Sequence, residues 1–425
     1  MTGARLRALV GAICAVGLVV AFGLPSASSG RTRHGRASTC ASPDVNSPRD
    51  PANPLALPTR LSNGDPLQGA HLFVDGPRHG QAAGAVAQLI GVDPKNLSES
   101  LSWADFKAQH QAAINGDGKA KAISKIADQQ ETQNISLYSE GGGPGAINGQ
   151  TSKLLCNNMA ADAGDGSVMV FTTFFWPNGN ECPSAGDLRG WDGTFHRLVG
   201  EMARAIGNKR AVVLMEIDGI GLSSCMKRDA LPLWLGDLKY EAKTLGGQPH
   251  TVVYMEGGYS DANSAGLTAR RLWKAGVKNV RGFWTNGTHF AWSINEIHWA
   301  QDVVNDLKTI SHGRYAAHFV VNTAQNGQGP KIPTNIVKQG NEELCNPPGR
   351  GLGRMPTGDV NPTFDGKNFQ SLDGFLWTGV PGRSHNSNCP GGPWKPSGVF
   401  DPKFGLELAQ NANQKLGPGS PSQPY

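Results

Sequence analysis

Two carboxylates follow a short apolar run near the middle of the chain. The run 211–215 is too short for a buried helix and rich in β-branched residues, so it is typical of a strand buried on both faces. It ends at Glu216 and Asp218, which share one side-chain parity, and Gly219 and Gly221 come next. Acids at the carboxyl end of a buried parallel strand lie where α/β barrels place their chemistry. The alternative is that Asp218 merely caps the following helix.

Polar residues also follow other apolar runs along the chain. Glu181 comes just after the second run, Glu256 after the fourth, and Asn286 and Asn322 after the fifth and sixth. The carboxyl ends of parallel strands gather on one face of a barrel, so these residues favour a polar cleft. Carboxylates without a cysteine nucleophile, a metal cluster or a phosphate loop indicate acid/base hydrolysis, with glycosides as the leading substrate class. The sequence contains no GxSxG, HExxH or GxxxxGK[ST] motif, so it carries no signal for a serine hydrolase, a zinc protease or a P-loop enzyme.

Seven β-rich runs alternate with helical patterns and would position these side chains. We expect strands at 135–138, 168–174, 211–215, 251–255, 280–284, 318–321 and 374–377. We expect helices at 119–130, 191–206, 262–275 and 293–310. Repeated β–α units imply a parallel sheet covered by helices, and seven strands suit a slightly short barrel. Two long loops, 322–343 and 346–372, carry turn residues, and long loops in a compact domain are usually functional.

Composition bounds the class of protein. Charged residues are 17% of the 425-residue chain and 56 residues are Gly, which describes a loop-rich globular protein. The net charge of +5 is accounted for by five arginines near the N-terminus: Arg5, Arg7, Arg31, Arg33 and Arg36. The sequence therefore predicts no basic face for nucleic acid.

The N-terminus has the order of a secretory signal. Arg5 and Arg7 precede an apolar run at 8–24 and a small-residue segment at 25–30, so we expect a signal peptide at 1–29; an uncleaved membrane anchor is the alternative. We further expect a flexible linker at 30–66, a barrel domain at 67–416 and a disordered tail at 417–425. Seven cysteines less Cys14 in the signal leave six, an even count that suggests disulfides in an exported chain, with fifteen possible full pairings. No CxxC spacing is present, which argues against zinc.

Five sequence blocks, in order, resemble glycoside hydrolase family 6, the inverting cellulases and cellobiohydrolases. Glu216-Ile-Asp218 is similar to the family's Glu-Pro-Asp, and Tyr-Met-Glu-Gly-Gly-Tyr-Ser at 254–260 is similar to Tyr-Leu-Asp-Ala-Gly-His-Ser. The other three blocks lie at 281–286, 318–330 and 345–353. The resemblance covers roughly residues 68–415 and implies a distorted seven-stranded parallel β/α barrel.

The resemblance also implies roles for particular residues. Asp218 takes the position of the general acid that protonates the leaving oxygen, and Glu181, just before Cys182, falls where the family has a helper Asp. Glu256 replaces another family Asp and is a substrate-binding candidate. Further substrate-binding candidates are Trp284, Asn286, Asn322 and Arg383.

The departures from the family fall mostly in the cleft. Where the last strand of the family leads to a Lys and then a Glu-x-Asp that holds the attacking water, this chain has Gly379, Arg383 and His385. We therefore take His385 as the candidate base, with a solvated loop residue as the alternative. The family has two Trp residues that stack on sugar rings. One of these positions is Leu344 here, and the other falls near Ala262. Asn322 and Gln325 stand for an Asp and an Arg.

The family's half-cystine positions imply the disulfides Cys182–Cys225 and Cys345–Cys389, and Cys40–Cys156 would be the third. Three functions remain open: a secreted inverting β-1,4-glucan hydrolase, a weak or inactive relative that binds a polysaccharide or another wall component, and a hydrolase of a different glycan. For the first we expect no cofactor or metal, a polysaccharide substrate, no nucleic-acid partner, no membrane contact once the signal is cleaved, and a monomer.

Overall fold

The computed structural model describes residues 64–137, 145–161, 167–207, 209–330, 345–385, 387–389 and 391–418, with the side chains of 156–161 left out. The expected signal peptide, almost all of the linker and most of the expected tail lie outside this part of the chain, as do Cys40, Leu344 and the Cys156 side chain. The expected Cys40–Cys156 disulfide therefore stays a prediction. Among the described residues, no helix is long and apolar enough to cross a membrane.

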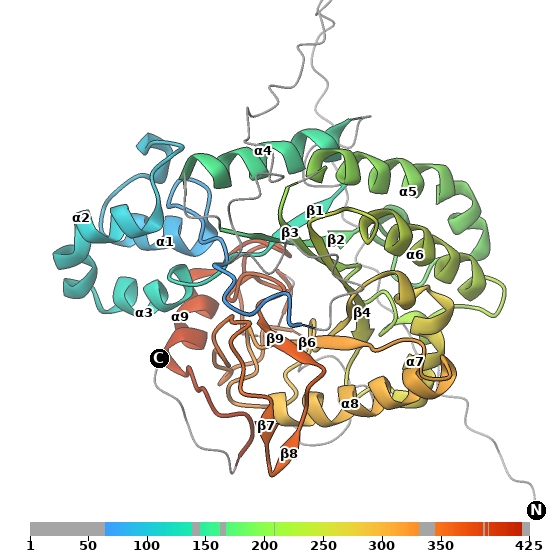
Figure 1. Ribbon diagram of the computed structural model, residues 1–425. Coiled ribbons are helices and arrows are strands. Elements are labelled where there is room, and N and C mark those ends of the chain that lie inside the picture. The colour runs from blue at the N-terminus through green and yellow to red at the C-terminus, as the bar shows by residue number, and fades with distance from the viewer. Residues whose placement is uncertain are drawn as a thin grey trace, which may run out of the picture. The chain divides into compact units, whose positions relative to one another are not determined.

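Seven parallel strands form one curled sheet, as Figure 1 shows. They are β1 Gln133–Ser136, β2 Met169–Phe174, β3 Ala211–Met215, β4 Thr251–Gly258, β5 Gly282–Thr285, β6 His318–Asn322 and β9 Leu372–Leu376. The strands pair in the order β1-β2-β3-β4-β5-β6-β9, with each new strand added beside the last. This is the predicted distorted β/α barrel, and all seven expected strands are present to within a few residues.

Both faces of β3 are buried, which explains why this strand is a continuous apolar run in the sequence. In β3, Val212 and Leu214 point into the barrel interior, where they pack with Tyr254 and Trp284. Val213 points to the opposite face and joins the core beneath the helices. A strand buried on both sides leaves no polar alternation, so only its length and β-branched content identify it.

The two edge strands, β1 and β9, do not pair with each other, but two side chains that precede β1 hydrogen-bond to the residue that follows β9. Gln130, just before β1, accepts a hydrogen bond from the backbone N–H of Trp377 at 3.2 Å and donates one to its carbonyl oxygen at 3.1 Å. The Thr132 hydroxyl donates to the same carbonyl oxygen. These contacts satisfy backbone groups that would otherwise be left at an open sheet edge.

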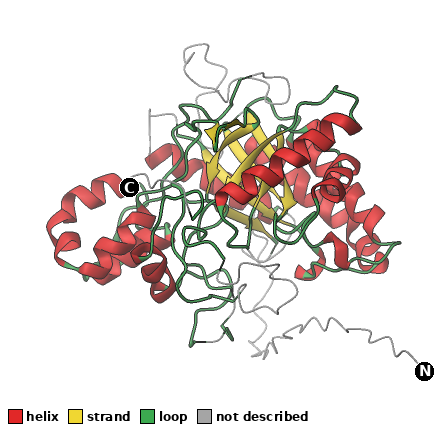
Figure 2. Cartoon of the chain, turned by 90° about the horizontal axis from the view of Figure 1, so that it is seen from below, coloured by secondary structure: helices red, strands yellow, loops and turns green. Residues whose placement is uncertain are grey.

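Helices cover the outside of the sheet, as Figure 2 shows from below. Those that follow one another around it are α4 Ala146–Ala161, α5 Ala185–Ile206, α6 Leu231–Leu245, α7 Ala265–Lys274 and α8 Ser293–Ile310. A second group packs around its own apolar cluster: α1 Gln81–Leu89, α2 Trp103–Gly116, α3 Gly118–Ala127 and α9 Pro402–Gln410. Short 3₁₀ turns lie at Pro94–Asn96, Pro177–Gly179, Ser223–Cys225 and Val277–Asn279.

Several element boundaries differ from expectation for local reasons. Helix α5 begins at Ala185, earlier than predicted, because Ser184 and Asp187 form a reciprocal capping box at its start. The predicted loop 346–372 contains a small hairpin, β7 Thr363–Phe364 and β8 Lys367–Asn368. Strand β4 runs on to Gly258, so Glu256 lies inside that strand rather than after it.

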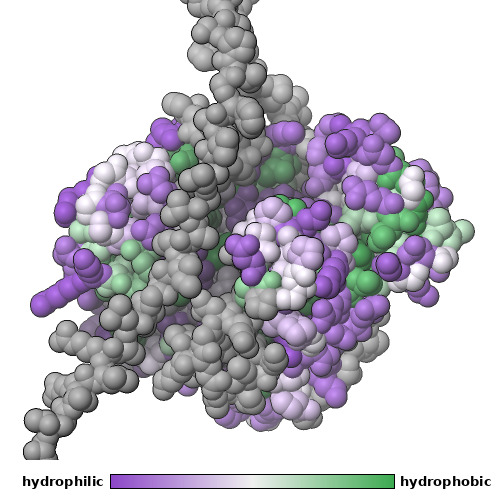
Figure 3. All heavy atoms as spheres, turned by 180° about the vertical axis from the view of Figure 1, so that it is seen from behind, coloured by the Kyte–Doolittle hydropathy of each residue, from purple (hydrophilic) through white to green (hydrophobic). Residues whose placement is uncertain are grey.

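The described surface is largely polar. Figure 3 shows polar groups over most of the visible coloured face, with apolar groups in smaller areas between them. Among the described residues, Val399 is the one exposed large hydrophobic side chain, at 45%.

Candidate active site

The turn after β3 has a backbone conformation that ordinary side chains rarely adopt. Glu216 has φ +41° and Asp218 has φ +64°, both in the left-handed region. The turn is closed by a hydrogen bond from the Gly219 N–H to the Glu216 carbonyl oxygen, at 2.9 Å. Backbone strain of this kind costs about 1–3 kcal/mol for each residue and is concentrated at functional sites.

This turn changes where Glu216 lies. The expectation that Glu216 and Asp218 share a face is wrong, because two left-handed residues end the strand alternation. The Glu216 carboxylate accepts hydrogen bonds from the Phe175 N–H at 3.0 and 2.9 Å and is fully buried. Its neighbours are Glu241 and Asp237 on α6, both buried. Glu216 therefore belongs to a buried acid cluster beneath the helices, and Asp218 is the carboxylate associated with the other predicted acids.

Burial of this acid cluster makes stability depend on pH. The pKa of Glu216 is raised from 4.5 to about 8, first by burial, and Asp237 adds to the rise. A carboxyl group whose pKa is raised on folding contributes stability that is fully present below its unfolded value and is lost as the pH rises through the folded value. We expect Glu216→Gln, which keeps the acceptor for Phe175, to flatten the fall in the free energy of unfolding between about pH 5 and pH 8 by roughly 1–4 kcal/mol.

Urea unfolding at a series of pH values measures this effect. Asp229→Asn is a suitable control because Asp229 is exposed. An unchanged pH dependence in Glu216→Gln would contradict the assignment of Glu216 as a buried, proton-binding group.

Asp218 has an environment that favours its protonated form. The side chain is 6% exposed, and its Oδ1 atom has no hydrogen-bond partner among the described residues. Burial raises the pKa of Asp218 well above its usual value, and the nearby charges of Glu181 and Glu256 raise it further. The Thr288 hydroxyl lowers that pKa in part. A carboxyl group whose pKa is raised in this way keeps its proton to higher pH and can act as a general acid.

Glu256 braces the loop that carries Asp218. It is fully buried, and its Oε2 atom accepts hydrogen bonds from the backbone N–H groups of Ile220 at 2.7 Å and Gly221 at 2.8 Å. Burial raises the pKa of Glu256 to about 7, although these hydrogen bonds act against the rise. A Cβ atom at Gly221 would lie 3.1 Å from the Glu256 Oε1 and 2.6 Å from the Tyr259 ring, so this position has no room for a side chain.

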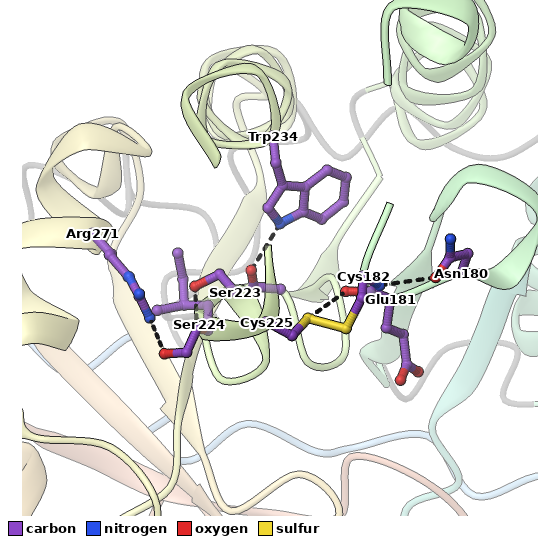
Figure 4. Close-up of a disulfide and its surroundings, with 10 residues drawn as sticks. Asn180, Glu181, Cys182, Ser223, Ser224, Cys225, Trp234 and Arg271 are labelled. Carbon is purple, nitrogen blue, oxygen red and sulfur yellow. Dashed lines mark hydrogen bonds between the residues drawn. A yellow bond between two sulfur atoms is a disulfide. The ribbon is translucent and has the colours of Figure 1, made fainter. Parts of the chain in front are cut away.

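Glu181 reaches the site from the loop after β2, and a disulfide holds that loop in place. Cys182 and Cys225 are bonded across 43 residues of sequence, with their Cα atoms 5.7 Å apart. Figure 4 shows this bond joining the Glu181 loop to the segment that follows Asp218, beneath Trp234, which donates a hydrogen bond to the Gly219 carbonyl oxygen. Burial raises the pKa of Glu181 to about 7. The predicted Cys345–Cys389 disulfide is also present.

We expect loss of the first disulfide to weaken both the fold and the site. In the chain-entropy model, replacing Cys182 and Cys225 by Ser should lower the free energy of unfolding by about 4 kcal/mol, less any strain relieved. Urea unfolding measures this, and Cys345→Ser/Cys389→Ser is the matched control because its loop is of nearly equal length, 44 residues. Non-reducing peptide mapping that links Cys182 to another cysteine would contradict the pairing.

Three predicted substrate-binding residues are buried. Trp284 is fully buried in the barrel interior and donates a hydrogen bond to the Met215 carbonyl oxygen at 3.0 Å. Asn286 and Asn322 tie the β5 and β6 loops together, since each side-chain amide donates to the other residue's backbone carbonyl oxygen, at 3.1 and 2.7 Å. The hydrogen bonds of these three side chains are therefore made within the protein.

His385 and Arg383, which were predicted in the same loop of the site, contact different residues. The Nε2 atom of His385 lies 3.5 Å from the Nε2 atom of Gln325, and its backbone N–H donates to Asn346 Oδ1 at 2.8 Å. Arg383 instead donates from Nε to Gln81 Oε1 at 3.3 Å and interacts with the charge of Glu131. Burial raises the pKa of Glu131 to about 7, and Arg383 acts against that rise.

Sequence reasoning missed Glu131, Tyr259, Thr288 and His289. Glu131 lies ahead of β1 and meets Arg383 only through the fold, so no local pattern marks it. Tyr259 and Thr288 follow β4 and β5, and that position beyond a strand end is the signal that could have found them.

One group on the outer helices has the spacing of metal ligands. Asp192 and His196 of α5 and Asp237 of α6 have potential ligand atoms within 4.8 Å of one another. Asp192 and His196 are partly or fully exposed, and exposed acidic groups are common without an ion. The expectation of no cofactor or metal stays a prediction.

A curled parallel barrel with buried carboxyl groups at the carboxyl ends of its strands has the arrangement of an α/β-barrel enzyme. The family model described as Glycosyl hydrolases family 6 matches residues 179–392, just over half of the chain. The chain belongs to this family, and the protein is a glycoside hydrolase.

Curated relatives and solved structures agree with this assignment. "Endoglucanase 1" of Streptomyces halstedii is 29% identical over 340 residues, which cover 77% of this chain and 94% of the relative. "Endoglucanase 1" of Streptomyces sp. (strain KSM-9) is 29% identical over 304 residues, 69% of this chain and 73% of that relative. The endoglucanase Cel6 from Mycobacterium tuberculosis shares the fold, with a TM-score of 0.61 and 22% identity over 82% of this chain and 99% of that one.

Proposed function

We propose that this glycoside hydrolase cleaves β-1,4-glucan, a cellulose-like polysaccharide, with inversion, and that Asp218 is the general acid. The observation that carries the proposal is the position of Asp218, a buried carboxyl group beside Glu181 and Glu256 whose pKa is raised well above its usual value. The curated relatives named endoglucanase support the substrate class. Inversion is supported by the match of Glu216-Ile-Asp218 to the family's signature.

In the proposed reaction, protonated Asp218 gives its proton to the glycosidic oxygen as the bond from that oxygen to the anomeric carbon breaks. A water molecule attacks the anomeric carbon from the opposite face and loses its proton to a base, so the configuration inverts. The carboxylate of Asp218 must then be reprotonated before the next cycle. Glu181 favours that step because a neighbouring negative charge disfavours the ionised form of Asp218.

We propose that three buried residues position the site rather than contact the sugar. Glu256 holds the backbone at Ile220 and Gly221, just beyond Asp218. Asn286 and Asn322 hold the neighbouring loops together. Rigid support of this kind keeps an acid within hydrogen-bond reach of its target, which is needed because small displacements cost large factors in rate.

His385 is the proposed base. In the resemblance, His385 and Gln325 stand where the family has an Asp and an Arg, and here the two side chains lie 3.5 Å apart. A charged pair has thus been replaced by a neutral amide and an imidazole. Neutral imidazole can accept a proton from water, whereas imidazolium cannot. We therefore propose that turnover of ordinary β-1,4-glucan is slow compared with that of enzymes that keep a carboxylate at this position.

A second function is favoured by one specific observation. Gly379, Arg383 and His385 replace the Lys and acidic residues of the family's last loop, and Arg383 interacts with Glu131 instead. A chain altered in this way could bind a polysaccharide or another wall component with little or no hydrolysis. Against this reading, clustered acids that repel one another have no purpose in an abandoned site.

Turnover on a panel of soluble glucans separates the two functions. The proposal predicts that the wild type releases reducing ends from soluble β-1,4-glucan and that Asp218→Asn loses this activity. If the wild type and Asp218→Asn both bind this glucan and neither releases reducing ends, the second function is favoured. Hydrolysis of a different glycan, without hydrolysis of β-1,4-glucan, would support the proposed reaction but change the proposed substrate.

Export is part of the proposal. The charged, apolar and small-residue order at 1–30 and the two disulfides support a signal peptide and an extracellular location. We propose cleavage near residue 29, a linker to residue 66 and a monomeric barrel domain over 67–416.

A further inference from the structure

A group of four polar and aromatic residues beside Asp218 takes no part in the reaction as proposed. Tyr259 and Asp261 lie on the loop after β4, and Thr288 and His289 lie on the loop after β5. Tyr259 and His289 are almost fully buried, at 1% and 2% exposed. Burying polar groups is costly unless they are paired, so their arrangement calls for an explanation.

The first contact joins a histidine to a carboxylate. The Nδ1 atom of His289 lies 2.7 Å from Asp261 Oδ1. This contact fixes the orientation of the imidazole ring, as carboxylate partners of histidines do elsewhere. Asp261 Oδ2 is buried and has no hydrogen-bond partner among the described residues, so the carboxyl group meets His289 through Oδ1.

The second contact joins this histidine to Tyr259. Their rings stack with centroids 3.7 Å apart and an interplanar angle of 8°. The Tyr259 hydroxyl lies 3.2 Å from the Thr288 hydroxyl, and Thr288 is the side chain that lowers the pKa of Asp218. Asp261 therefore connects to the acid through His289, Tyr259 and Thr288 in turn.

The third contact joins Tyr259 to the backbone that follows Asp218. The Tyr259 ring fills the space that a Cβ atom at Gly221 would take, 2.6 Å away. Asn263 accepts from the Tyr259 N–H at 3.1 Å and donates to the Gly221 carbonyl oxygen at 3.1 Å. The loop after β4 is thus fastened to the Asp218 loop by a ring contact and by a shared asparagine.

We propose that Tyr259, Thr288, His289 and Asp261 form a positioning unit for Asp218. The Asp261–His289 pair holds the Tyr259 ring against Gly221, and the Tyr259 hydroxyl holds the Thr288 hydroxyl toward the Asp218 carboxyl group. The inference rests on the proposed role of Asp218 as general acid. None of the four residues needs to touch the substrate, and their effect on rate passes through the acid.

This arrangement predicts a distinctive kinetic signature. His289→Ala should lower kcat on an unactivated cello-oligosaccharide by about tenfold or more, because a displaced acid transfers its proton poorly, and should leave KM within about twofold. The loss should be much smaller on an aryl β-cellobioside with a very good leaving group, since that substrate hardly needs the proton. Asp261→Asn and Tyr259→Phe should show the same pattern to a lesser degree.

The double variant Asp218→Asn/His289→Ala provides the sharpest readout. Residues that act through one another are non-additive, so the double variant should be no slower than Asp218→Asn alone. His79→Ala is the matched control, because His79 Nε2 also lies near a carboxylate, Glu99 Oε2 at 2.6 Å, away from the acid. His79→Ala should leave kcat unchanged on both substrates.

Three outcomes would overturn the inference. The first is an equal loss of kcat on the two substrates in His289→Ala. The second is a loss of kcat in the double variant that equals the product of the two single losses. The third is an unchanged ratio of kcat on the two substrates in folded Asp261→Asn and Tyr259→Phe. These last two variants decide the matter if His289→Ala does not fold. If the rate loss in Asp218→Asn does not depend on the leaving group, the proposed function fails. If that loss does depend on it but the losses in the variants of the four residues do not, this inference alone fails.

Discussion

Replacing Asp218 by Asn is expected to lower turnover of an unactivated β-1,4-glucan by about a hundredfold or more. Asparagine has nearly the same size, so the turn after β3 is kept, but it cannot give a proton to the leaving oxygen. In the wild type, the raised pKa of Asp218 keeps that proton in place, and activity should fall as the pH rises through this pKa. Initial rates of reducing-end release, measured across pH, test both statements.

A substrate that does not need protonation is the control for this prediction. On an aryl β-cellobioside with a very good leaving group, Asp218→Asn should be hurt far less than on the glucan. Equal losses on the two substrates would remove Asp218 from the role of acid and would point to a general disturbance of the fold.

Replacing His385 by Ala is the second change with a large expected effect. Loss of a positioned base costs about 10²–10⁴ in rate. If His385 takes the proton of the attacking water, activity in the wild type rises with pH through the range in which histidine titrates, and His385→Ala abolishes that rise. The contact with Gln325 predicts that Gln325→Ala also lowers the rate, by a smaller factor, because it removes a side chain that orients the imidazole.

His312→Asn is the control for this pair of variants. His312 is exposed and has φ +54°, a conformation that Asn tolerates well. Rates in His385→Ala that equal the wild type on soluble cellulose, with the same pH profile, would make His385 a solvated loop residue and leave the base unassigned.

Strand β3 was predictable because burial on both of its faces leaves a simple pattern in the sequence. The β3 run was found at its true bounds, Ala211–Met215, since nothing polar interrupts it. The turn that follows was not predictable in the same way. Strand parity placed Glu216 beside Asp218, but the left-handed conformations of both residues send Glu216 toward Phe175 and the acid cluster on α6.

The site could be predicted only in part, because its remaining contacts join distant residues. Asp218 was found from the end of a strand and from a family signature, and the raised pKa agrees with a role as acid. Arg383 meets Gln81 across 302 residues of sequence, and its interaction with Glu131 has no local pattern. The Tyr259–His289 stack also depends on two loops that meet only in the folded barrel.

The stereochemistry of the first product tests the central claim most directly. Proton NMR in the first minutes of cello-oligosaccharide hydrolysis, before mutarotation, distinguishes the two anomers at the new reducing end. The proposed mechanism, with Asp218 as acid and water attacking the opposite face, predicts that the α-anomer appears first and that Asp218→Asn does not form it at a comparable rate. A β-anomer that appears first would show retention of configuration and would contradict the mechanism.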